Sequence, residues 1–298
     1  WHTPFWQGRD IQTDILEMYG HLLDACLSFY QIAFEDCINF YNDYKKRLVA
    51  YGYSPREAYV DFAEFYIETG HMDSAKKYLR KARAIPFSKS DCIACATITE
   101  IKYYLLEDEK EKADKLAEKI RNGTLRCRGV LSDSMLGLER TYLKYYILNG
   151  DYDKAAEAAD ILEHSSSEVK VYNRWASFMC AYASQKPGRG LRIYKKHWKD
   201  IENEQRPEYM YGSFKDAACF FMGLKKVKGK DTIKLPLDNT FPLYNEENIY
   251  NIDSLARYYY KKAEDVAKKF DKRNGTDRYV NELGISVKNI LAGGMAAV

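Results

Sequence analysis

Two cysteines separated by two residues are the first feature of this sequence that could support chemistry. The segment Cys92-Ile-Ala-Cys95 places two thiols at the spacing of a redox pair or of half a zinc site. No second cysteine pair or closely spaced histidine pair follows it, and no strand pattern precedes it. We therefore expect both side chains to pack inside a buried helix, and we expect no bound metal or other cofactor.

Other residue types that carry chemistry are not arranged as catalytic sites. Lys186-Pro-Gly-Arg-Gly190 has the composition of a phosphate-binding loop, but it lies between two predicted helices and lacks the Gly-Lys-Ser/Thr ending. Ser165-Ser-Ser167 has no nucleophile elbow around it, and the five histidines form no pair four residues apart. Acidic residues alternate with lysine, which is typical of solvated helix faces. These patterns predict a protein that is not an enzyme.

The composition is that of a folded chain with little preference for nucleic acid. Hydrophobic residues make up 46% and charged residues 30%, and the formal net charge is only +3. Seven cysteines, an odd number in mostly apolar contexts, favour a reducing compartment and hence the cytoplasm. An extracytoplasmic sensor domain is the alternative. No apolar run reaches the roughly eighteen residues of a membrane span, so we expect no membrane segment in this chain.

An internal repeat is the strongest pattern in the sequence. Small or apolar anchor residues recur at intervals of 38, 42 and 36, and each follows a tyrosine by nine residues. An apolar residue lies a further three positions before each tyrosine, on the same helical face. The anchors are Ala75, Ala113, Ala155 and Leu191, and the tyrosines are Tyr66, Tyr104, Tyr146 and Tyr182. The spacing predicts pairs of helices, each of which needs its neighbour to cover its apolar face.

These residues resemble the tetratricopeptide repeat (TPR) family over roughly residues 55 to 200. The best matches are Tyr59-Val-Asp-Phe62-Ala63 with Tyr66, Gly70 and Ala75, and Leu143 to Ala155. The family repeat is regular at thirty-four residues, whereas these repeats are longer and uneven, and Asp108 and Lys186 stand where Gly70 and Gly150 stand. The resemblance implies an α-solenoid of antiparallel helix pairs whose first helices line a concave groove. It places four residues in that groove: Tyr59, Tyr103, Tyr145 and Arg174.

We accordingly expect an all-α chain in three parts. Capping helices occupy residues 1–54, degenerate TPR-like repeats occupy 55–203, and C-terminal helices occupy 204–298. An irregular insertion is expected near 228–250, where Asp238-Asn239 is a hairpin signal weakened by a proline in each flanking arm. The insertion is either functional or merely connecting.

The resemblance implies a non-catalytic scaffold that binds a protein or peptide partner. A second hypothesis is a ligand- or peptide-sensing regulatory domain cut from a longer, membrane-anchored signalling protein, because both ends of the sequence look like internal cuts. A third is an enzyme with a site at the insertion. The sequence specifies neither the partner nor the oligomeric state.

Overall fold

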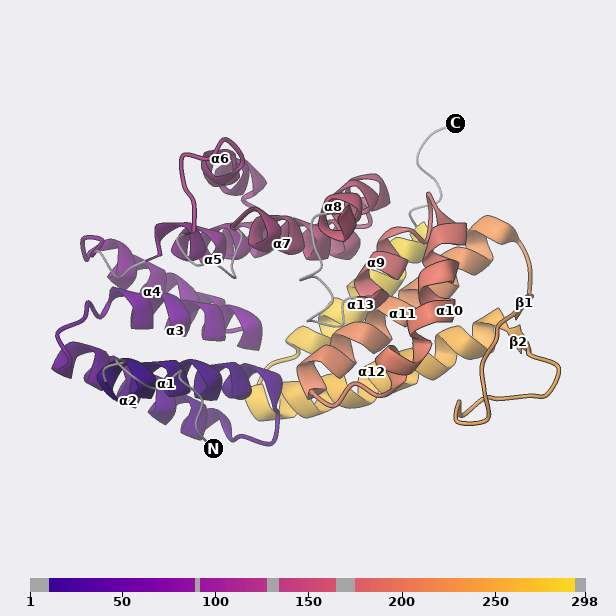
Figure 1. Ribbon diagram of the computed structural model, residues 1–298, viewed down its shortest axis with the longest axis horizontal. Coiled ribbons are helices and arrows are strands. Elements are labelled where there is room, and N and C mark those ends of the chain that lie inside the picture. Colours follow the sequence, from indigo (N-terminus) through magenta and orange to yellow (C-terminus); the bar gives the residue numbers. More distant parts are fainter. Residues whose placement is uncertain (1–10, 89–91, 128–133, 165–174, 293–298) are drawn as a thin grey trace, which may run out of the picture. The chain divides into compact units, whose positions relative to one another are not determined.

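The chain is almost entirely helical. The computed structural model (Figure 1) describes residues 11–88, 92–127, 134–164 and 175–292, and within them the chain forms thirteen helices and two short strands. The all-α prediction is confirmed. None of the helices in these ranges is long and apolar enough to cross a membrane. The chain divides into two compact units, Trp1–Gly129 and Val130–Val298, so the boundary falls inside the region predicted for the repeats.

The first unit is built from consecutive helix pairs. Its first helices pack on more than their own partner: α3 contacts α1, α2 and α4, and α5 contacts α3, α4 and α6. Aromatic side chains fill the seams, with Tyr41 of α2 packed against Phe62 and Phe65 of α3 at ring separations of 5.1 and 4.9 Å. The elements are α1 (Ile11–Ser28), α2 (Phe34–Ala50), α3 (Arg56–Thr69), α4 (Met72–Arg83), α5 (Ile93–Leu106) and α6 (Lys110–Arg121).

The second unit repeats this packing. Helix α9 contacts α7, α8 and α10, and α11 contacts α9, α10 and α12. In both units, therefore, the first helix of a pair lies against both helices of the pair before it. The elements are α7 (Ser134–Asn149), α8 (Tyr152–His164), α9 (Trp175–Ala181), α10 (Pro187–Glu202), α11 (Pro207–Lys228), β1 (Thr232–Lys234), β2 (Ile249–Asn251), α12 (Ile252–Asn274) and α13 (Arg278–Ala292).

The same backbone junction joins the two helices of four pairs. The carbonyl of the repeat tyrosine accepts a hydrogen bond from the residue just before the second helix, as from His71 to Tyr66 at 2.8 Å. That residue's own carbonyl then accepts from the fourth residue of the second helix, as from Ala75 to His71 at 3.0 Å. The equivalent chains of bonds are Tyr104–Glu109–Ala113, Tyr146–Asp151–Ala155 and Tyr182–Lys186–Gly190. In the first three pairs a residue with positive φ makes the turn: Gly70, Asp108 or Gly150.

The fourth pair departs from the predicted register by one residue. Helix α10 begins five residues after Tyr182, whereas the other second helices begin six residues after their tyrosine. Gly190, rather than Leu191, consequently occupies the fourth position of its helix. A Cβ added at Gly190 would lie 2.5 Å from the ring of Phe220 and 2.9 Å from the carbonyl oxygen of Met179. Leu191 is half-buried, whereas the three alanine anchors are fully buried.

The insertion between α11 and α12 is non-helical as expected, and no tight hairpin forms at Asp238-Asn239. Strand β1 pairs in antiparallel fashion with β2, with Ile233 opposite Tyr250, so the loop is far longer than a turn at Asp238-Asn239. Asp238 instead accepts hydrogen bonds from the backbone and hydroxyl of Thr240 at 3.0 and 2.5 Å. Pro236 and Pro242 have no backbone N–H to donate to a strand ladder, so the segments that contain them do not pair with each other. Strand β1 pairs with β2 instead.

Helix α13 was not singled out by the sequence analysis. It packs on α11 and α12 and also on α7, the first helix of the second unit. The side-chain amide of Asn289 donates to the carbonyl of Leu148 at 2.6 Å, across 141 residues of chain. Ile290 lies close to Gly223, where an added Cβ would come within 2.9 Å of it. The C-terminal helix therefore joins the last helices of this unit to its first.

Candidate functional site

The four residues predicted to line a groove are placed differently from one another. Tyr103 is buried among Ala63, Ala75 and Leu79, and burial together with a hydrogen bond to Glu107 raises its pKa to about 12. Its neighbour Tyr104, expected to pack inward, is only half-buried. The two tyrosines thus exchange roles, because the buried face of α5 passes through residue 103.

Tyr59 and Tyr145 are both half-buried on first helices. The ring of Tyr59 lies 6.0 Å from that of Tyr78, and the ammonium groups of Lys81 and Lys45 lie 5.5 and 5.9 Å from its centroid. Tyr145 makes an edge contact with Tyr146 at 5.7 Å. Arg174 lies outside the described residues. The structure therefore offers Tyr59 and Tyr145 as accessible rings, one in each unit.

Two repeat tyrosines make an equivalent polar contact with the preceding helix pair. The Tyr104 hydroxyl accepts from the guanidinium of Arg83 at 2.6 Å, and the Tyr182 hydroxyl donates to Glu163 at 3.0 Å. Arg83 and Glu163 occupy the same position, eight residues after the anchors Ala75 and Ala155. The tyrosines thus act in both units as polar links between pairs, which their inward packing alone did not predict.

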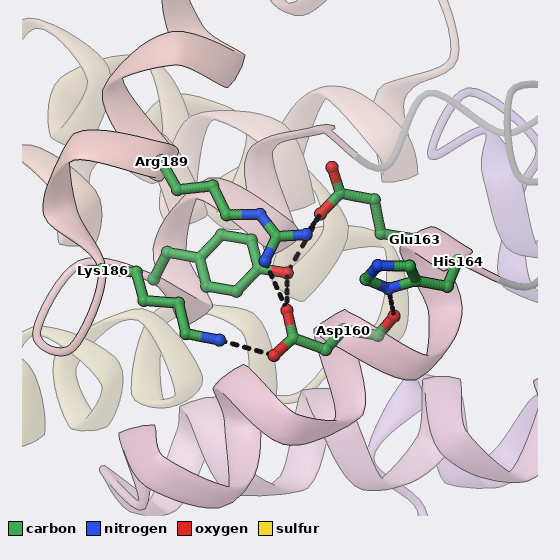
Figure 2. Close-up of polar contacts among 6 residues, drawn as sticks. Asp160, Glu163, His164, Lys186 and Arg189 are labelled. Carbon is green, nitrogen blue, oxygen red and sulfur yellow. Dashed lines mark hydrogen bonds and ion pairs between the residues drawn. The ribbon is translucent and has the colours of Figure 1, made fainter.

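Figure 2 shows a cluster in which Lys186 and Arg189 point toward the carboxylates of Asp160 and Glu163. Lys186 lies 2.5 Å from Asp160, and Arg189 lies 2.7 Å from Asp160 and 2.6 Å from Glu163. The positive charges of the Lys186–Gly190 segment are already balanced by acids of α8. Residues 187–190 form the first turn of α10, and the ion pairs connect α10 to α8 instead of leaving a cationic cradle for phosphate.

The cluster predicts a specific loss of stability in acid. Burial acts to raise the pKa of Asp160, but hydrogen bonds from Lys186 and Tyr182 and the charge of Arg189 outweigh it, and the pKa is lowered. The folded state therefore binds fewer protons than the unfolded chain, so this stabilisation is present above the ordinary aspartate pKa and is lost as pH falls through the lowered value. We expect the difference in urea stability between the wild type and Asp160→Asn to shrink from about pH 6 to about pH 3. A difference that stays constant with pH would contradict the assignment.

The first-helix side of the first unit carries a surplus of carboxylates. Glu57, Asp61, Glu64 and Glu68 recur at intervals of four, three and four residues and so share one face of α3. Lys102 of α5 binds two of them, Glu64 at 2.9 Å and Glu68 at 2.5 Å. Burial and the negative charges of Glu57 and Glu64 raise the pKa of Asp61 well above its usual value. A cationic group placed beside this face would relieve that repulsion.

Three thiols form the group in the described residues that is suited to holding a metal. Cys92, Cys95 and Cys127 bring their sulfur atoms within 4.8 Å of one another, and Cys95 is exposed while the other two are half-buried. The expectation of two buried helical cysteines is therefore wrong, because Cys92 precedes α5 and Cys95 lies on its open first turn. Burial, followed by the neighbouring thiols, raises the pKa of Cys95 above its ordinary value. Cys127 was missed because it lies 32 residues beyond Cys95 and outside any short motif.

Comparison with known proteins adds no family to these observations. No protein-family model, curated protein or solved structure matches the chain. The function must therefore be inferred from the geometry of this chain.

Proposed function

We propose that this chain is a non-catalytic TPR-like scaffold that binds a polypeptide on the face formed by its first helices. The observation that carries the proposal is the contact pattern within each unit, in which α3, α5, α9 and α11 each pack on both helices of the preceding pair. The repeated junction from tyrosine carbonyl to anchor amide supports it, because it recurs in four pairs despite their uneven lengths. Such stacking builds a continuous core and exposes a row of first helices.

The carboxylates of α3 favour a positively charged peptide as the partner of the first unit. Four acids share this face of α3, and Lys102 binds two of them, Glu64 and Glu68. Because the acids outnumber Lys102, a peptide carrying lysine or arginine would be attracted to this face, whereas an acidic peptide would be repelled. Tyr59, half-buried on the same helix, supplies aromatic surface for an apolar neighbour.

Selection from random displayed peptides tests the proposal. Enriched sequences should be rich in Lys and Arg, and their affinity for the chain, measured by fluorescence anisotropy, should fall by about 10-fold in Glu57→Gln/Glu64→Gln, which leaves the Lys102–Glu68 ion pair in place. The matched control is Glu111→Gln/Glu118→Gln, which removes two exposed acids from the second helix α6 and should leave binding unchanged. Failure to enrich any peptide, or an equal loss in both variants, would contradict binding on the first-helix face.

A further inference from the structure

The three-thiol cluster has the dimensions of a tetrahedral zinc site. The sulfur of Cys127 lies 3.4 Å from that of Cys92 and 3.7 Å from that of Cys95. Zinc binds thiolate sulfur at about 2.3 Å, so two sulfurs in a tetrahedral site lie about 3.8 Å apart. All three sulfurs are within 4.8 Å of one another, so small side-chain rotations suffice to surround one ion.

Backbone contacts independent of the thiols position the cluster. After α6, the chain turns at Asn122, whose side chain accepts from the backbone of Thr124 at 3.0 Å. The amide of Leu125 then donates to the carbonyl of Lys119 at 2.7 Å, which folds the segment back along α6 and toward the start of α5. Cys92 immediately precedes α5 and Cys95 follows one turn later, so both point toward this segment's Cys127. The turn after α6 and the start of α5 therefore bring the three donors together.

We propose that Cys92, Cys95 and Cys127 bind one Zn²⁺ as thiolates, with the fourth position open to water or to a donor from outside the chain. Sulfur donors select thiophilic ions such as zinc over magnesium and calcium, which require oxygen ligands. Zinc also has no redox chemistry of its own, and it accepts tetrahedral geometry without preference from its d-electrons. Partial exposure of the cysteines leaves a route for the ion to enter.

Zinc at this position would stabilise the pair formed by α5 and α6. It joins the start of α5 to the segment after α6, residues separated by 32 to 35 positions in the chain. An ion that binds the folded pair better than the unfolded chain stabilises the folded state. The zinc proposal does not depend on the proposed peptide binding. The three cysteines lie at the start of α5 and after α6, whereas the proposed peptide contacts are the carboxylates of α3.

The test is zinc binding by the full chain, reduced and freed of metal by a chelator. After zinc is added back, we expect one Zn²⁺ per chain to remain through gel filtration and the melting temperature to rise reversibly. Replacing zinc with Co²⁺ should give an intense thiolate-to-cobalt charge-transfer absorption, a readout that requires no variant. Cys95→Ser changes an exposed residue and should weaken zinc affinity by about 100-fold or more. The matched control Cys219→Ala removes a buried thiol of the second unit and should keep the full zinc content.

Three results would overturn the proposal. One is a reduced, folded chain that retains no zinc and shows no cobalt charge-transfer band. Another is a Cys95→Ser variant that binds zinc as tightly as the wild type, which would place the ion elsewhere. The third is a purified chain in which mass spectrometry finds a Cys92–Cys127 or Cys95–Cys127 disulfide and whose reduced form ignores zinc, because the cluster would then be a redox pair.

Discussion

Gly190→Val is expected to lower the free energy of unfolding of the second unit by about 3 kcal/mol, because the position has no room for a side chain. Even one added carbon would lie 2.5 Å from the ring of Phe220, which is fully buried, and 2.9 Å from the carbonyl oxygen of Met179. The carbonyl belongs to the backbone of α9 and cannot rotate away, so α10 must separate from α9. Urea unfolding followed by the fluorescence of Trp175 and Trp198, both in this unit, measures the loss.

Gly188 provides a control two residues earlier in the same helix. A Cβ added there meets no atom within 4 Å. Gly188→Ala should therefore increase stability by roughly 0.5–1 kcal/mol, because alanine restricts the unfolded chain and favours the helix. Opposite signs at the two glycines would establish Gly190 as a contact point between helices, whereas similar effects would contradict the close approach.

Lys215→Met is expected to cost about 3 kcal/mol, because it removes the nearest cation from buried Asp216 and from partly buried Glu282, which keeps Arg278 at 4.0 Å. Lys215 of α11 is only 9% exposed, and its ammonium lies 2.5 Å from Glu282 of α13 and 3.8 Å from Asp216. Burial acts to lower the pKa of Lys215, but the two negative charges outweigh it and raise the pKa. Asp216 also accepts a hydrogen bond from Ser177 at 2.5 Å, so the charges link α9, α11 and α13. Thermal and urea unfolding at neutral pH measure the effect.

A second substitution separates the charge from the side-chain packing. Lys215→Met/Glu282→Leu replaces both partners with apolar groups and should recover much of the stability lost in the single variant. Lys268→Met, which removes an ion pair with Glu264 on the surface of α12, should have no measurable effect. If the double variant were less stable than Lys215→Met by the full cost of a second mutation, the two residues would not act as a pair.

The sequence predicts the helix pairs well because their signals are local. Apolar periodicity, the tyrosine nine residues before each anchor, and the glycines at 70 and 150 act within about ten residues. These local patterns predict the helices α3 to α8 and the buried residues Ala75, Ala113 and Ala155 from the order of residues alone. The fourth pair fails by one position because its turn is a residue shorter, and nothing local distinguishes Gly190 from Leu191 as the anchor.

The candidate sites were less predictable because they depend on distant contacts. Either Tyr103 or Tyr104 could face inward, since adjacent residues on a helix are separated by about 100°. The choice depends on the neighbouring pair, whose Ala63 and Leu79 enclose Tyr103. Cys127 comes close to Cys92 because the chain turns after α6. The residues next to either cysteine in the sequence do not indicate this contact. The presence of a helix is therefore predictable from the sequence, whereas the face it buries and its contacts with other pairs depend on the fold.

The position of α13 sets the order in which the protein can fold during its synthesis. A ribosome releases the chain from its N-terminus, and domains generally fold as units once their residues have emerged. Helices of the first unit are linked by near neighbours in sequence, such as Glu64 and Lys102, and can pack early. Helix α7 must wait for α13, whose Asn289 reaches back to Leu148. Until then α7 lacks its last covering helix, so translation pauses or chaperones that act before residue 289 emerges would affect the second unit and spare the first.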